Sequence, residues 1–114
     1  MANSRSYPFQ FIVEDDILIK YEGYDSEIEI PEGILAIENK TFWYNKFLTK
    51  ITLPTTLKAI GNYAFCGCAA LSEINIPSGV RHIGKMAFNG CSKLTELDLP
   101  DSVDCVFREQ FLWR

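Results

Sequence analysis

Two stretches of the chain carry one pattern: ITLPTTLKAIGNYAFCGCAAL at residues 51–71 and INIPSGVRHIGKMAFNGCSKL at residues 74–94. Their equivalent positions lie 23 residues apart, and the same offset continues toward both ends of the 114-residue sequence. Proline recurs at positions 31, 54, 77 and 100, each time directly after Ile or Leu. A fixed period with several columns in one register is typical of repeat proteins, in which each unit stacks on its neighbours.

The repeat also places apolar residues in fixed columns. These columns are Ile28, Ile51, Ile74 and Leu97; Ile34, Leu57, Val80 and Val103; Ile37, Ile60, Ile83 and Val106; and Leu48, Leu71 and Leu94. An aromatic column contains Phe42, Phe65, Phe88 and Phe111. Because equivalent side chains of stacked coils lie ~4.8 Å apart, we expect continuous ladders, with the phenylalanines as the thickest part of the core.

The local structure of one unit follows from residues 74–94. The alternation in Ile74-Asn75-Ile76 predicts a half-buried strand, which the following proline ends because it has no N–H to donate. A second extended segment over residues 80–83 is expected to turn at Gly84, where a positive φ costs little. A short helical turn over residues 85–88 should follow. The sequence therefore predicts a repeat solenoid, mainly β with short helical turns.

The signature I-P…V…I-G…A-F…C…L, from about residue 26 to residue 111, resembles the BspA-like class of leucine-rich repeats. The resemblance implies a right-handed coil of about three and a half repeats, with units at about 26–48, 49–71, 72–94 and 95–114. It also implies a non-catalytic surface for protein binding or adhesion, usually in secreted or cell-surface bacterial proteins. Glu38 and Phe107 replace the glycines of the middle units, so the terminal coils should be irregular.

The N-terminal part is expected to cap the solenoid. Residues 1–8 are expected to be a flexible N-terminus, and residues 9–25 a β-hairpin. Apolar residues alternate in FQFIV (9–13) and again in ILIKY (17–21), with the acidic trio Glu14-Asp15-Asp16 at the turn. The trio lacks the spaced ligands of a calcium loop, so we interpret it as a solvated turn.

Composition limits the classes of partner. The chain is 47% hydrophobic and 13% aromatic with a net charge of −4, which favours a folded domain and argues against nucleic acid and anionic membranes. No segment is long and apolar enough to cross a bilayer, which takes ~20 residues. The first ten residues lack a secretory signal, so the chain as written is expected to be cytoplasmic, whereas the resemblance suggests secretion or the cell surface if it is a fragment.

Four cysteines lie at positions 66, 68, 91 and 105. Cys68 and Cys91 are one period apart, in a column that holds Asn45 in the first unit. In leucine-rich repeats this column often places a donor against a backbone carbonyl of the neighbouring coil, so we expect stacked, buried, reduced thiols. A disulfide between them is the alternative, although stacked Cβ atoms should lie farther apart than the ~3.8 Å of a disulfide.

A zinc site built from Cys66, Cys68, Cys91 and His82 is a second alternative, but the C-x-C spacing is unlike that of structural zinc sites. His82 is the only histidine, Arg81 beside it has the wrong sign to orient an imidazolium, and no nucleophile motif is present. We therefore expect neither catalysis nor a metal or other cofactor.

Two surfaces are candidates for binding a protein partner. The first is the set of residues that alternate with buried ones on the strands: Glu27, Lys50, Glu73 and Glu96, and beside them Glu29, Thr52, Asn75 and Asp98. This largely acidic face should attract a basic segment, with Lys58, Arg81, His82 and Lys85 forming an opposite, basic strip. The alternative is that the charges only keep the sheet soluble and monomeric.

The second candidate surface is aromatic. Trp43, Tyr44 and Phe47 occupy columns that hold small or polar residues in the next two units, so they should face outward and serve as binding hot spots. The alternative is that they pack against the N-terminal hairpin. Two further hypotheses concern the whole molecule: a capping fragment of a larger surface adhesin, or a structural protein that forms a homodimer through its last coil.

Overall fold

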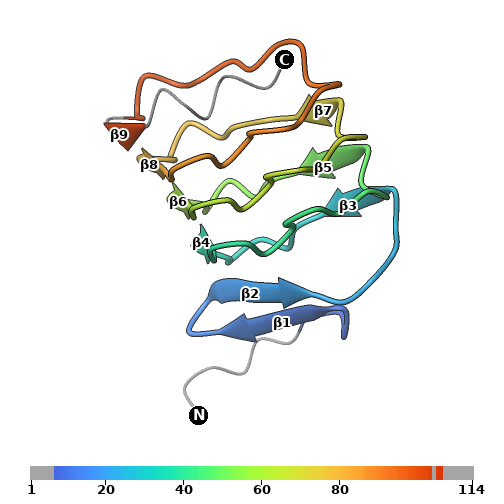
Figure 1. Cartoon of the computed structure of the whole chain (residues 1–114). Coiled ribbons are helices and arrows are strands. Elements are labelled where there is room, and N and C mark those ends of the chain that lie inside the picture. The colour runs from blue at the N-terminus through green and yellow to red at the C-terminus, as the bar shows by residue number, and fades with distance from the viewer. Residues whose placement is uncertain (1–6, 104, 107–114) are drawn as a thin grey trace.

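A computed structural model describes residues 7–103 and 105–106 and shows a β-hairpin followed by a stack of coils (Figure 1). The hairpin consists of β1 (Phe11–Glu14) and β2 (Ile17–Tyr21), which pair antiparallel. Asp15 and Asp16 form its turn with positive φ values of 53° and 62°. Aspartate tolerates this left-handed backbone better than most residues, which explains why the acidic pair stands at the turn.

After the hairpin the chain alternates between two sheets, in which all strand pairs other than β1–β2 are parallel. One contains β3 (Glu27–Glu29), β5 (Lys50–Thr52) and β7 (Glu73–Ile74). The other has the order β1-β2-β4-β6-β8-β9, where β4 is Ala36–Ile37, β6 is Ala59–Ile60, β8 is His82–Ile83 and β9 is Cys105–Val106. Figure 1 shows the two sheets on opposite sides of the stack, with the hairpin beneath the first coil.

The strand register reproduces the sequence period. Ile28 pairs with Ile51 and Ile51 with Ile74, and in the other sheet Ile37 pairs with Ile60 and Ile60 with Ile83. Each partner is one period later in the chain, so each of the first three coils adds one strand to both sheets, whereas the last adds, among its described residues, only β9, which pairs with β8. The predicted repeat solenoid with an N-terminal hairpin cap is confirmed.

Phenylalanine rings form the centre of the core. The rings of Phe42 and Phe65 lie 5.2 Å apart and 3° from parallel, and those of Phe65 and Phe88 lie 5.5 Å apart and 2° from parallel. Tyr21 of the hairpin continues the stack, 5.6 Å from Phe42. All three phenylalanines are buried. Phe111, expected as the next member, lies outside the described residues.

Polar side chains also bridge equivalent positions of successive coils. The Asn39 side-chain oxygen accepts from the Asn62 N–H at 2.7 Å, and the Asn62 oxygen accepts from the Lys85 N–H at 2.8 Å. Glu32 accepts from both the N–H and the hydroxyl of Thr55, and these bonds hold the pKa of the Glu32 carboxyl below its usual value. The coils are thus joined at their turns as well as through the sheets.

Two local expectations are wrong. The segment 85–90 is a series of turns without a helix, because Met86 has a φ of 57°, which a right-handed helix cannot accommodate. Gly84 does not have a positive φ; instead a Cβ there would lie 2.5 Å from the backbone nitrogen of Asn62. Glycine is therefore needed for close approach of two coils, and left-handed glycines stand at positions 33, 67 and 90.

Candidate functional site

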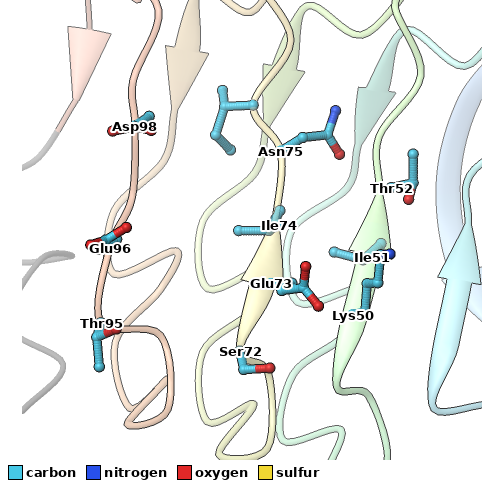
Figure 2. Close-up of a pocket in the computed structure, with 11 residues that line it drawn as sticks. Lys50, Ile51, Thr52, Ser72, Glu73, Ile74, Asn75, Thr95, Glu96 and Asp98 are labelled. Atoms are coloured by element: carbon cyan, nitrogen blue, oxygen red, sulfur yellow. The ribbon is translucent and has the colours of Figure 1, made fainter.

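We define the strand face as the outward side chains of the three-stranded sheet, together with Asn75 just after β7 and two residues of the adjacent non-strand segment; its members are Glu27, Glu29, Lys50, Thr52, Glu73, Asn75, Glu96 and Asp98. All eight are exposed. Lys50 pairs in register with Glu27 on one side and Glu73 on the other, so one positive charge separates two negative ones. Figure 2 shows Glu96 and Asp98 on the chain segment that runs beside β7.

The strand face opens into a shallow cleft of about 630 Å³ between β5, β7 and the segment 95–98 (Figure 2). The side chain of Asn75 lines the cleft, and its Oδ1 accepts from the Leu53 N–H at 2.9 Å. In the preceding pair of coils the equivalent N–H, that of Ile30, donates to the Thr52 carbonyl. A side-chain amide thus replaces a rung of the ladder, and β7 ends after two residues.

The cleft exposes part of the apolar core. Ile28 and Ile51 are buried, whereas Ile74, in the same column, is half-buried and lines the cleft together with Ile76. No strand is assigned over residues 95–100, the described segment next to β7. The strand face is therefore acidic at its rim and apolar at its floor.

The second surface is an aromatic patch, which we define as Tyr24, Trp43, Tyr44 and Phe47. Their exposed fractions are 81%, 49%, 64% and 44%. The rings form two edge-on pairs: Tyr24 lies 5.4 Å from Phe47, and Trp43 lies 5.1 Å from Tyr44. A hollow of about 220 Å³ lies among them, lined also by Tyr21, Gly23, Thr41, Phe42, Asn45 and Lys46.

The backbone under the patch is unusual for its residue types. Tyr44 has a φ of 56°, and Gly67 and Gly90 follow it at the same position of the next two coils, with φ values of 78° and 81°. Left-handed backbone carries little penalty in glycine but is unfavourable for a tyrosine. The first coil therefore keeps a bulky exposed aromatic at a position where its neighbours carry glycine.

Two lysines accompany the aromatic rings. The ammonium of Lys40 lies 4.9 Å from the ring centroid of Trp43, and that of Lys46 lies 5.9 Å from that of Phe47. On the hairpin side the Tyr21 hydroxyl donates to Asp25 at 2.9 Å. Burial, with this bond as a smaller cause, raises the pKa of Tyr21.

The segment that follows the hairpin covers part of the aromatic patch without burying it. Tyr24, just beyond β2, contacts Phe47, yet both rings stay exposed. Sequence reasoning missed Tyr24, Lys40 and Lys46. The repeat period could have identified Tyr24, because Tyr24 stands one period before Phe47.

The cysteine column forms buried hydrogen bonds between coils. The Cys68 thiol donates to the Phe42 carbonyl at 3.0 Å, and the Cys91 thiol donates to the Phe65 carbonyl at 3.1 Å. Burial raises the pKa of each thiol to about 12. Both cysteines are free. Asn45 behaves differently, because its side-chain oxygen accepts from the backbone of its own loop.

The remaining candidates do not converge on one site. Lys58, Arg81, His82 and Lys85 are all exposed along the side of the second sheet. Among the described residues, no group of three or more His, Cys, Asp or Glu side chains has the geometry to hold a metal ion. No helix within the described ranges has the length and apolarity to span a membrane.

A family model for the BspA type leucine rich repeat region (6 copies) matches residues 21–112. The chain belongs to this family. Among curated proteins, none matches the sequence. The BspA-type repeat of this chain thus spans the last residues of the hairpin and every coil described above.

Solved structures share the fold. A leucine rich cell surface protein from Faecalibacterium prausnitzii superposes with a TM-score of 0.77 at 29% identity over 93% of this chain. A leucine-rich repeat protein from Bacteroides capillosus has a TM-score of 0.77 at 24% identity, covering 86% of this chain and 82% of its own. One from T. pallidum has a TM-score of 0.72 at 23% identity, covering 90% and 64%. The chain spans 34% of the Faecalibacterium protein.

Proposed function

We propose that this BspA-type chain is a non-catalytic module that binds a protein partner, with the aromatic patch as its principal contact surface. The observation that carries the proposal is the exposure of Trp43, Tyr44 and Phe47, at positions where the next coil has Cys66, Gly67 and Ala70. Tryptophan and tyrosine are enriched among the few residues that carry most of the binding energy in protein interfaces, and exposed apolar patches mark such interfaces. The repeat signature itself contains no catalytic residue.

The strand face is the proposed second contact surface. Its rim carries the carboxylates of Glu73, Glu96 and Asp98 around an apolar floor. This charge would speed association with a basic segment and align it, while Ile74 and Ile76 offer apolar contact. The competing explanation, that the carboxylates only prevent sheet-to-sheet association, predicts binding that is insensitive to salt and to charge reversal.

We propose a cell-surface setting for this binding. The Faecalibacterium protein is named a cell surface protein, and the present chain corresponds to about a third of it. The chain would then act as a capping part of a longer adhesin. A cytoplasmic location stays the alternative prediction.

Self-association is the second candidate function. It is favoured by the half-buried Ile74, which lies beside the non-strand segment at residues 95–100. Light scattering across a concentration series tests it, because a dimer joined through the last coil would dissociate on dilution. A constant monomer mass would remove this candidate.

The main proposal is tested with immobilised protein. Proteins that bind to the immobilised chain are identified by mass spectrometry and purified. Each is then titrated by surface plasmon resonance against the wild type and three variants. The double variant Trp43→Ala/Tyr44→Ala should weaken binding at least about tenfold. Glu73→Lys/Glu96→Lys should reduce the association rate and its salt dependence. Phe9→Ala, an exposed aromatic outside the patch, is the matched control and should have no effect. Equal affinity of all variants would contradict the proposal.

A further inference from the structure

We infer that the aromatic patch takes an extended, proline-rich segment in the polyproline II conformation, with a carboxylate next to the prolines. This inference rests on the proposed function, because it names the chemistry of the partner at the same surface. Three properties of the patch carry it: the arrangement of the rings, the kind of polar group beside them, and the sign of the nearby charge.

The rings form two edge-on pairs beside a hollow. Tyr24 and Phe47 are one edge-on pair, Trp43 and Tyr44 are the other, and the hollow of about 220 Å³ lies among them. Proline-rich segments bind grooves lined by aromatic rings, where proline rings pack between aromatic faces. Because a polyproline II helix is already extended when free, it loses little conformational entropy on binding.

The polar groups around the hollow are mainly donors. Among the described residues, neither the Trp43 indole N–H nor the Lys46 ammonium has a hydrogen-bond partner. The Asn45 side-chain oxygen is already occupied, because it accepts from the N–H groups of Phe47 and Leu48 at 2.9 and 3.1 Å. Its amide N–H groups are left to donate. A proline-rich segment offers free carbonyls and few N–H groups, which is the complementary set.

The charge beside the rings is positive. Lys40 lies over Trp43 and Lys46 lies over Phe47, so these two ammonium groups outnumber the carboxylate of Asp25, which accepts from the Tyr21 hydroxyl. Two ammonium groups so close to the rings disfavour a cationic ligand, such as a methylated ammonium or a basic peptide. They favour a carboxylate in the bound segment. A basic partner segment would instead meet the acidic strand face.

The test uses intrinsic fluorescence of the whole chain. The sequence has two tryptophans, so Trp113→Phe leaves Trp43 as the single reporter. The probe is a synthetic peptide of consecutive prolines with a glutamate at each end. It should shift Trp43 emission saturably when titrated up to about 1 mM. A peptide of the same length and charge with glycine in place of every proline should bind at least about tenfold more weakly.

Variants then locate the contact. Tyr44→Ala should weaken binding at least about tenfold, whereas Phe9→Ala should leave it unchanged. Lys40→Gln/Lys46→Gln should weaken binding at low salt, and exchanging the glutamates of the peptide for lysine should do the same. Circular dichroism establishes that each variant is folded.

Three outcomes would overturn the inference: no saturable shift, equal binding of the glycine peptide, or an unchanged affinity in Tyr44→Ala. If the peptide fails while the aromatic double variant still abolishes capture of a purified protein partner, the inference is wrong and the proposed function stands.

Discussion

The ring of Tyr44 lies over Gly67, the residue one period later in the chain. A Cβ placed on Gly67 would come within 2.6 Å of Cε1 of Tyr44. Both residues have a positive φ, so the turn has the same left-handed backbone in the two coils. The aromatic patch can spread over the second coil because that coil has no side chain at this position. The patch thus depends on a glycine outside it.

Gly67→Ala is expected to destabilise the protein by about 1–3 kcal/mol, because alanine at this φ is strained and its methyl group clashes with the Tyr44 ring. Chemical denaturation measures the change. Gly79→Ala is the matched control, since φ at Gly79 is not positive and its nearest neighbour is the flexible end of Lys58 at 3.2 Å. Equal stability of the two variants would show that the turn can adopt another backbone conformation.

Phe65→Ala should cost about 3–5 kcal/mol, the usual range for deleting a fully buried phenyl ring. Phe65 stacks on a ring on each side, so its removal leaves a cavity between Phe42 and Phe88. Thermal unfolding of the variant measures this. Phe9→Ala, at an exposed position, should change stability by less than about 0.5 kcal/mol. A loss of under about 1 kcal/mol in Phe65→Ala would mean that the ladder contributes little to stability.

The thiols of Cys68 and Cys91 should resist alkylation in the native protein. Burial raises both pKa values to about 12, against 9.0 for the free side chain, so at pH 8 each carries about a thousandfold less thiolate. Iodoacetamide labelling tests this, with the extent of alkylation measured for each cysteine-containing peptide. The denatured chain is the control. Rapid labelling of Cys68 without denaturant would contradict the buried hydrogen bond.

The same shifts give stability a pH dependence. A thiol whose pKa is higher in the folded state keeps its proton where the unfolded chain loses it. Stability should therefore fall as pH rises from about 9 to about 12. Cys68→Ala should flatten this decline, which urea denaturation at several alkaline pH values would reveal. An unchanged slope would show that this thiol does not contribute to the decline.

Lys50→Glu should destabilise the strand face by about 0.5–1 kcal/mol, because a third carboxylate would then stand in register between Glu27 and Glu73. High salt should recover most of the loss by screening. Lys58→Glu makes the same change of net charge on the other sheet and serves as control. If both variants lose equal stability, the loss comes from the overall charge and not from repulsion of position 50 by Glu27 and Glu73.

Much of the fold could be predicted from the period alone. The offset of 23 residues places Ile51 beside Ile28 and Phe65 beside Phe42, and the structure has these neighbours. The details of the turns could not be predicted in this way. Met86 and Tyr63 adopt a left-handed backbone because packing between coils outweighs local preference, and that balance is not visible in a single unit.

The candidate surfaces could likewise be predicted from the sequence only in part. Alternation in the sequence predicts that Glu73 and Asp98 face solvent, because successive side chains of an extended chain point to opposite sides, and both are exposed. Only the tertiary structure decided that the Asn75 amide interrupts the ladder, that Ile74 becomes half-exposed, and that Tyr24 joins Phe47 beside a hollow. The sequence by itself determines which residues recur and so which side chains stack. The tertiary structure decides how far apart two coils lie and which rings stay uncovered, since both depend on contacts between residues that no single repeat contains.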